Sequence, residues 1–213
     1  MPSSPKIPKD KILETALLLL IRDGYTSLNI KTLAKELGCS TQPISWHFGN
    51  MEGLRKGLAD YALSYTNKKM QPHTDNAFEA FTEIGNAYAN IAFDEPNLFR
   101  FLFLDGSSGY CIGGMETICG LSENNELIEN ISELFGITID NAAEYVGNCT
   151  IYSHGILALV VSGVIKSDKN QVLQMIDNAG YAFLLKAGGN IDYAMELNNK
   201  LERKKNGITK MEV

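Results

Sequence analysis

Apolar residues recur every three or four positions along nearly the whole chain, with polar residues between them. Near the start, Ile12, Ala16, Leu17 and Leu20 share one face of a predicted helix. Strict alternation of apolar and polar residues, typical of half-buried strands, is not sustained over several segments. The pattern therefore predicts an all-α fold. The expected helices cover residues 9–23, 30–37, 40–47, 51–70, 76–93, 96–104, 125–135, 140–165, 168–186 and 192–205.

Turn and cap residues divide the first 50 positions into three short helices. Gly24 and Gly38 each follow a helical pattern, as glycines at helix C-termini do. Asn29 is expected to cap the second helix and Ser40 the third, because these side chains accept hydrogen bonds from free N–H groups. Pro43 falls in the first turn of the third helix, where a missing N–H is tolerated. This plan is typical of a helix-turn-helix module, although any helical bundle can begin with three short helices.

Charge divides the chain into two unequal parts. The 213 residues carry 19 Lys and Arg against 25 Asp and Glu, a net charge of −6. Residues 1–70 hold 10 basic and 6 acidic residues, net +4, whereas residues 71–213 hold 9 and 19, net −10. A basic segment joined to a larger acidic one indicates a module for a polyanion and a separate body. We therefore expect two domains, with the boundary between residues 55 and 56.

Composition and motifs exclude several classes of protein. The segment 1–10 is polar and rich in proline, and no 20-residue apolar span follows, so neither a signal peptide nor a membrane anchor is expected. Four cysteines lie far apart, at Cys39, Cys111, Cys119 and Cys149, and read as reduced thiols. No catalytic motif is present, and an enzyme hypothesis would rest on the dispersed pair Cys149 and His154. We expect a cytoplasmic protein that is not an enzyme and uses no cofactor or metal.

One stretch of the predicted module carries a pattern of many matched positions. It reads I-L-E-T-A-L-L-L-L-I-R-D-G-Y-T-S-L-N-I-K-T-L-A-K-E-L-G-C-S-T-Q-P-I-S-W-H-F-G-N-M-E-G-L, with markers at Ala16, Gly24, Tyr25, Leu33, Ala34, Gly38, Ser40, His47, Phe48 and Leu54. This stretch closely resembles the DNA-binding domain of TetR-family transcriptional regulators, over about residues 10–58. The resemblance implies a ligand-responsive homodimer, usually a repressor. Residues 1–55 would then form the helix-turn-helix DNA-binding domain, and residues 56–213 an all-helical effector-binding and dimerisation domain.

The resemblance also assigns roles to residues of the module. It places Thr41, Gln42, Pro43, Ser45 and Trp46 on the base-facing side of the third helix, and Asn29, Lys31 and His47 near phosphates. A glutamine amide can pair with an adenine edge, and Pro43 or Trp46 can pack against a thymine methyl. Each assignment has a structural alternative: Trp46 as a core aromatic, Gln42 as a surface residue, and His47 as a hydrogen-bonded imidazole. Leu37, Ile44 and Phe48 are expected in the core.

Two positions depart from the family pattern. Ser45 stands where the family most often has a tyrosine that reaches a phosphate, and Met51 where it most often has a lysine. Each loss removes a backbone contact and lowers the salt-dependent part of DNA affinity, unless lysines at 9, 11, 31 and 35 compensate. An alternative is therefore a ligand- or partner-binding protein of the same fold that has lost sequence-specific DNA binding.

The C-terminal region is rich in aromatic residues that can line a small-molecule pocket. The segments 96–103 and 152–159 look like the C-terminal domain of one TetR subgroup, which often carries W-H-G where Tyr152-Ser153-His154-Gly155 stands. His154 can anchor a ligand or can bond to a neighbouring helix. A glycine-rich loop is expected over residues 105–121, with a short helix as the alternative. Candidate ligand-binding residues are Phe78, Tyr88, Phe99, Phe103, Tyr110, Met115, Tyr152 and His154.

The last long helices have apolar faces too broad for one subunit to bury. Their apolar residues are Ile151, Leu157, Leu159, Val160, Val164, Val172, Leu173, Ile176, Ala179, Ala182 and Phe183. Part of this surface suits a two-fold, four-helix interface, and the resemblance implies the same. A homodimer would place two recognition helices about one DNA turn apart, so the expected partner is a near-palindromic DNA operator.

Overall fold

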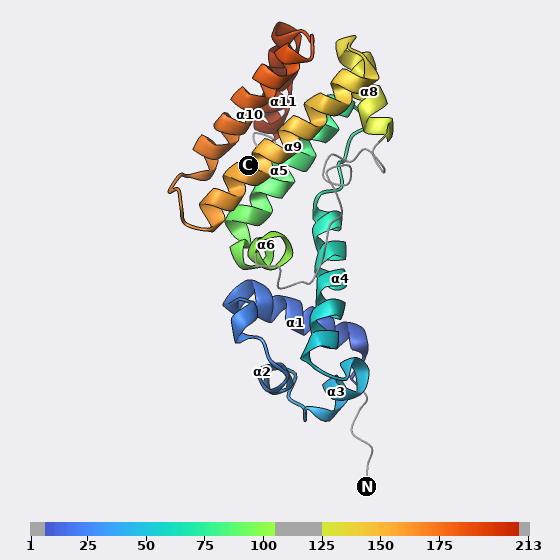
Figure 1. Ribbon diagram of the computed structural model, residues 1–213, viewed down its shortest axis with the longest axis vertical. Helices are drawn as coiled ribbons and strands as arrows, with labels where there is room; N and C mark the ends of the chain where they lie inside the picture. Colours follow the sequence, from blue (N-terminus) through green and yellow to red (C-terminus); the bar gives the residue numbers. More distant parts are fainter. Residues whose placement is uncertain (1–6, 105–124, 209–213) are drawn as a thin grey trace. The chain divides into compact units, whose positions relative to one another are not determined.

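The computed structural model describes residues 7–104 and 125–208, and within them the chain is helical with no strand (Figure 1). The predicted all-α fold is therefore confirmed for the described residues. The elements are α1 (Lys9–Asp23), the 3₁₀ turn η1 (Tyr25–Ser27), α2 (Ile30–Glu36), α3 (Gln42–Phe48), α4 (Met51–Lys69), α5 (Ala77–Asp94), α6 (Pro96–Phe103), α8 (Asn125–Phe135), α9 (Ile139–Val161), α10 (Lys169–Lys186) and α11 (Ile191–Ile208).

Two predicted helix ends are wrong, each for a local reason. The helix expected over residues 140–165 ends at Val161, because Gly163 takes a left-handed φ of 74° that no helix continues through. The third helix begins at Gln42 rather than at Ser40, and its N-cap residue Thr41 makes no side-chain cap hydrogen bond. Pro43 lies in its first turn and lacks one of the N–H groups that a cap side chain would bind.

The chain divides into two compact units. The first comprises the chain up to Met70, the segment from Asn90 that contains α6, and Val161–Val164. The second comprises Gln71–Ala89, the segment that contains α8 and most of α9, and the chain from Ile165 onward. This division follows packing and does not test the domain boundary predicted between residues 55 and 56.

The core of the first unit forms where α1 packs against α4 and α6. From α1, Ile12 and Leu20 are fully buried, and from α4 so are Leu54 and Leu58. Each such side chain stabilises the fold by about 1.5–3 kcal/mol relative to an exposed one. The same core holds the two short helices, since Leu33 of α2 and Ile44 of α3 are also fully buried.

The second unit has its own core. Phe78 of α5 meets Phe135 of α8 edge to face, with ring centroids 5.8 Å apart. The amide of Asn141 at the start of α9 donates to the Ala187 carbonyl just after α10, at 3.0 Å. Lys186 and Glu144 form an ion pair between the same two helices. These contacts fix α9 and α10 against each other within the unit.

Candidate nucleic-acid interface

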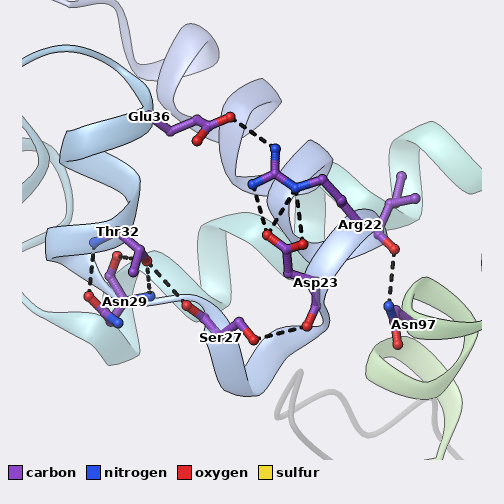
Figure 2. Close-up of polar contacts among 8 residues, drawn as sticks. Arg22, Asp23, Ser27, Asn29, Thr32, Glu36 and Asn97 are labelled. Atoms are coloured by element: carbon purple, nitrogen blue, oxygen red, sulfur yellow. Dashed lines mark hydrogen bonds and ion pairs between the residues drawn. The ribbon is translucent and has the colours of Figure 1, made fainter.

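A capping box fixes the start of α2 (Figure 2). The Asn29 side-chain oxygen accepts from the N–H groups of Lys31 and Thr32, both at 3.0 Å. In return, the Asn29 N–H donates to the Thr32 hydroxyl oxygen at 3.0 Å. This geometry satisfies N–H groups that a helix start leaves without partners. The predicted N-cap role of Asn29 is confirmed, and its proximity to DNA phosphate stays a prediction.

The ends of α1 and α2 are joined by an ion-pair cluster (Figure 2). The Arg22 guanidinium binds Asp23 at 2.8 Å and Glu36 of α2 at 3.1 Å. The hydrogen bond from Arg22 lowers the pKa of the Asp23 carboxyl, and the two carboxylates together raise the pKa of Arg22. Arg22 is therefore engaged by two acidic groups and serves the internal geometry of the helix-turn-helix module.

The third helix is anchored by one residue and presents polar side chains outward. Ile44 is fully buried in the first unit. Residues three and four apart share a face of a helix, and four exposed residues follow that spacing. We call them the outward face of α3: Thr41, Gln42, Ser45 and Trp46. Trp46 is 69% exposed, so the alternative of a core aromatic is wrong.

The remaining residues assigned to this region are less exposed. Pro43, Leu37 and Phe48 are half-buried, whereas Ile44 meets the core expectation fully. Lys31 lies exposed on the first turn of α2. The module thus presents one face of α3 to solvent beside a lysine, and its apolar residues hold that face in place.

His47 makes a contact that joins distant parts of the module. Its ring Nε2 lies 3.0 Å from the main-chain carbonyl oxygen of Ile7, so the tautomer that carries the proton on Nε2 donates to it. This geometry favours the alternative of a structural, hydrogen-bonded imidazole. A direct phosphate contact by His47 stays a prediction. Sequence reasoning did not identify Ile7, since no local pattern pairs residues 40 positions apart.

The first turn of α6 docks on the C-terminal end of α1. The Asn97 amide donates to the Ile21 carbonyl at 3.1 Å (Figure 2). Beside it, Gly24 adopts a φ of 81°, which L side chains rarely take. The rings of Tyr25 and Phe101 lie 5.0 Å apart. These contacts make α6 part of the same packed unit as the outward face of α3, a role that the sequence pattern did not indicate.

The start of α6 is also joined to the C-terminal end of α4. The Glu95 carboxylate accepts from the Tyr65 hydroxyl and the Lys69 ammonium, both at 2.7 Å. Burial raises the pKa of Tyr65, so its hydroxyl keeps the proton that it donates. The turn before α6 is therefore held by α4, as its first turn is held by α1.

The candidate ligand-binding residues form separate aromatic pairs. In the second unit, the Tyr88 hydroxyl lies 2.7 Å from His154 Nδ1. Burial raises the pKa of Tyr88 and lowers that of His154, which favours a neutral imidazole that accepts from the tyrosine. The other described pairs are Phe78 with Phe135, Tyr152 with Phe183 and, in the first unit, Phe99 with Phe103. Tyr110 and Met115 lie outside the described residues, as do Cys111, Cys119 and the expected glycine-rich loop.

Cys149 has the environment of a structural thiol. It is buried in the second unit, and burial raises its pKa to about 12. A thiol with that pKa is protonated at neutral pH and is a poor nucleophile. Over residues 7–104 and 125–208, no group of three His, Cys, Asp or Glu side chains is placed to hold a metal ion. No helix in those two stretches has the length and apolar character that crossing a membrane requires.

Comparison with known proteins identifies the N-terminal module. Residues 12–58 match the family model described as bacterial regulatory proteins, tetR family. The tetracycline repressor protein class C of Escherichia coli is 32% identical over 82 residues, which is 38% of this chain. The match spans 37% of that repressor, so the chain covers little more than a third of the curated relative.

Solved structures share the fold of the chain. One is a single-substitution variant of TetR from Acinetobacter baumannii AYE in complex with minocycline, with a TM-score of 0.57 at 17% identity. That match covers 85% of this chain and 99% of the other. Apo ActR from Streptomyces coelicolor matches with a TM-score of 0.50 at 16% identity, over 87% and 99% of the two chains. At such identities the likeness shows the fold alone.

Proposed function

The chain belongs to the tetR family of bacterial regulatory proteins by its N-terminal domain, and from this premise we propose that it is a DNA-binding transcriptional regulator. The observation that carries the proposal is the outward face of α3. A helix held by a fully buried Ile44 presents polar and aromatic side chains to solvent, within the matched domain. A short helix fixed in this manner suits the major groove, where base edges differ in their hydrogen-bonding groups.

Direct base contacts come from the outward face of α3 in this proposal. Gln42 offers both a donor and an acceptor to an adenine edge, and Trp46 packs against a thymine methyl. Thr41, Pro43 and Ser45 complete the base-facing set. Lys31 and the residues Asn29 and His47 lie toward phosphates, which set orientation rather than sequence preference.

The protein acts as a homodimer in this proposal. Apolar side chains remain exposed on two helices of the second unit, namely Ile151 and Leu159 on α9 and Met175 and Leu185 on α10. By contrast, Leu157 and Val172 of the same helices are fully buried within the chain. A second copy would cover the exposed residues in a two-fold interface. Two α3 helices about one DNA turn apart would then read a near-palindromic operator.

A small apolar or amphiphilic effector releases the repressor from its operator in this proposal. The aromatic pairs around Tyr88, Tyr152 and His154 supply apolar surface and polar anchors for such a molecule. The Acinetobacter baumannii protein of similar fold was solved in complex with minocycline. Effector and operator must weaken each other's binding by the same factor, because the linkage is reciprocal. The proposed location is the cytoplasm, where the DNA partner lies.

Selection of bound fragments from a random duplex library, at near-physiological salt, tests the proposal. We expect enrichment of one near-palindromic sequence. Titration with that duplex should change the fluorescence of Trp46, the single tryptophan of the chain. Equal affinity for all duplexes would contradict the proposal. It would favour the alternative of a ligand- or partner-binding protein in which Ser45 and Met51 mark the loss of backbone contacts.

A further inference from the structure

The start of the described chain is attached to the last turn of α3. His47 Nε2 lies 3.0 Å from the Ile7 carbonyl oxygen, and the Lys9 ammonium lies 5.7 Å from the centre of the Phe48 ring. The two contacts involve neighbouring residues of α3 and flank Pro8 on the other side. Whatever precedes Ile7 therefore leaves the domain beside the helix that the proposed function places in the major groove.

The residues before Ile7 have the length to reach the neighbouring groove. Pro8 holds an extended backbone, with φ −61° and ψ 146°. Prolines also stand at Pro2 and Pro5, and such sequences favour extended conformations of about 3.1 Å per residue. Residues 1–6 can then span about 19 Å. Half a turn of B-DNA, which separates a major groove from the next minor groove, is about 17 Å.

The chemistry of this segment suits the minor groove. Lys6 supplies a cation, and Ser3 and Ser4 supply hydroxyl groups that bond to phosphate and to base-edge acceptors. Narrow A·T-rich minor grooves concentrate negative potential and attract inserted basic side chains. Over residues 1–11 the chain holds three lysines and one carboxylate, Asp10, so this end of the module has a positive charge.

We propose that residues 1–6 form a DNA-binding arm that lies in the minor groove next to the major groove entered by α3, with Lys6 as its cationic contact. The His47 imidazole positions the arm by holding the Ile7 carbonyl. This inference rests on the proposed function and adds a second contact region on the same duplex. The expected preference is for A·T base pairs at the outer ends of the operator.

The first test removes the arm and leaves its anchor in place. The deletion of residues 2–6 and the single change Lys6→Ala are compared with the full chain on the selected operator. Each lost phosphate contact should lower the slope of log affinity against log salt by about 0.9. Hydroxyl-radical footprints should lose protection in the minor groove at both outer ends. Lys166→Ala removes the same charge from the second unit and should leave slope and footprint unchanged.

A double-mutant cycle separates positioning by His47 from a direct phosphate contact. His47→Phe keeps an aromatic ring but removes the nitrogen that bonds to Ile7. If His47 positions the arm, His47→Phe lowers affinity in the full chain and has no further effect once residues 2–6 are deleted. An equal loss in both backgrounds would overturn the positioning role and would indicate that the imidazole itself contacts DNA.

The outcomes distinguish this inference from the proposed function. If the full chain selects an operator and the deletion variant keeps its affinity, salt slope and footprint, the arm proposal alone is wrong. If the full chain binds no duplex, the proposed function and the arm proposal are both wrong. Selection of an operator together with a lower slope and loss of outer protection in the deletion variant supports both.

Discussion

The side-chain amide of Asn97 donates to the main-chain carbonyl of Ile21 at 3.1 Å. Ile21 lies in the last turn of α1, where carbonyl groups lack partners within the helix. Asn97 lies in the first turn of α6, more than 70 residues further along the chain. This bond, together with the packing of Tyr25 against Phe101, makes α6 a supporting element of the helix-turn-helix module.

Asn97→Ala should destabilise the first unit. The change leaves the half-buried Ile21 carbonyl without this donor, and the loss of such a hydrogen bond costs about 1 kcal/mol of unfolding free energy. Urea unfolding followed by circular dichroism measures the difference. Asn90→Ala is the matched control, because Asn90 lies exposed in α5 and should tolerate the change. Equal midpoints for the two variants would show that the Asn97 bond contributes no stability.

The helical framework could be predicted from the sequence because its signals are local. Apolar spacing and flanking Pro8 and Gly24 gave the bounds of α1 within the accuracy of any cap assignment. Asn29 was predicted as a cap because its hydrogen bonds reach only two and three residues ahead. The predicted cap at Ser40 failed, since Pro43 removes one of the N–H groups that would have used it.

Stability should fall as the pH drops below about 6.5, in part through His154. Burial lowers the pKa of His154 in the folded state, so the unfolded chain binds the proton more tightly. The stabilisation is complete above the unfolded pKa and is lost as pH falls toward the folded pKa. His154→Gln should reduce this fall in unfolding free energy between pH 7 and pH 5.

The control for this titration is another histidine. His73→Gln makes the same exchange in a side chain that is 89% exposed, and the pH dependence should persist. Chemical unfolding at a series of pH values provides the measurement. If His154→Gln and the wild type lost stability in parallel as pH falls, His154 would not be a source of the dependence.

Lys31→Ala should weaken binding to every duplex by a similar factor. Lys31 lies exposed on the first turn of α2, and the proposed function places it near a phosphate rather than a base. The slope of log affinity against log salt should fall by about 1. Fluorescence titrations at several salt concentrations, on the operator and on an unrelated duplex, give both quantities. Lys200→Ala in α11 should leave the slope unchanged, and a loss confined to the operator would refute the phosphate assignment.

Leu159→Glu should convert the proposed dimer into a monomer. Leu159 is 44% exposed on α9, and a carboxylate there would be buried without a partner in a two-fold interface. Sedimentation equilibrium reports the mass, and operator affinity should fall with it because one subunit reads one half-site. Leu18→Glu, on an exposed position of α1, should remain dimeric. A dimeric Leu159→Glu variant would place the interface elsewhere.

The contacts that complete the candidate site lie beyond what sequence reasoning can supply. His47 meets a main-chain carbonyl 40 residues away, and Asn97 meets one more than 70 residues away. A carbonyl has the same chemistry at every position, so the sequence contains no sign of which one a side chain will bind. The exposure of Trp46 likewise depends on which face of α3 Ile44 turns toward the core.

Sequence-specific reading by α3 is tested most directly by selecting duplexes with the wild type and with Gln42→Ala in parallel. Gln42 lies exposed on the outward face of α3, with both a donor and an acceptor for a base edge. We predict that the wild type enriches a near-palindrome and that Gln42→Ala relaxes the preference at one symmetric base position, with about 1–3 kcal/mol of discrimination lost there. An unchanged preference for Gln42→Ala, or no enriched sequence for the wild type, would contradict the account.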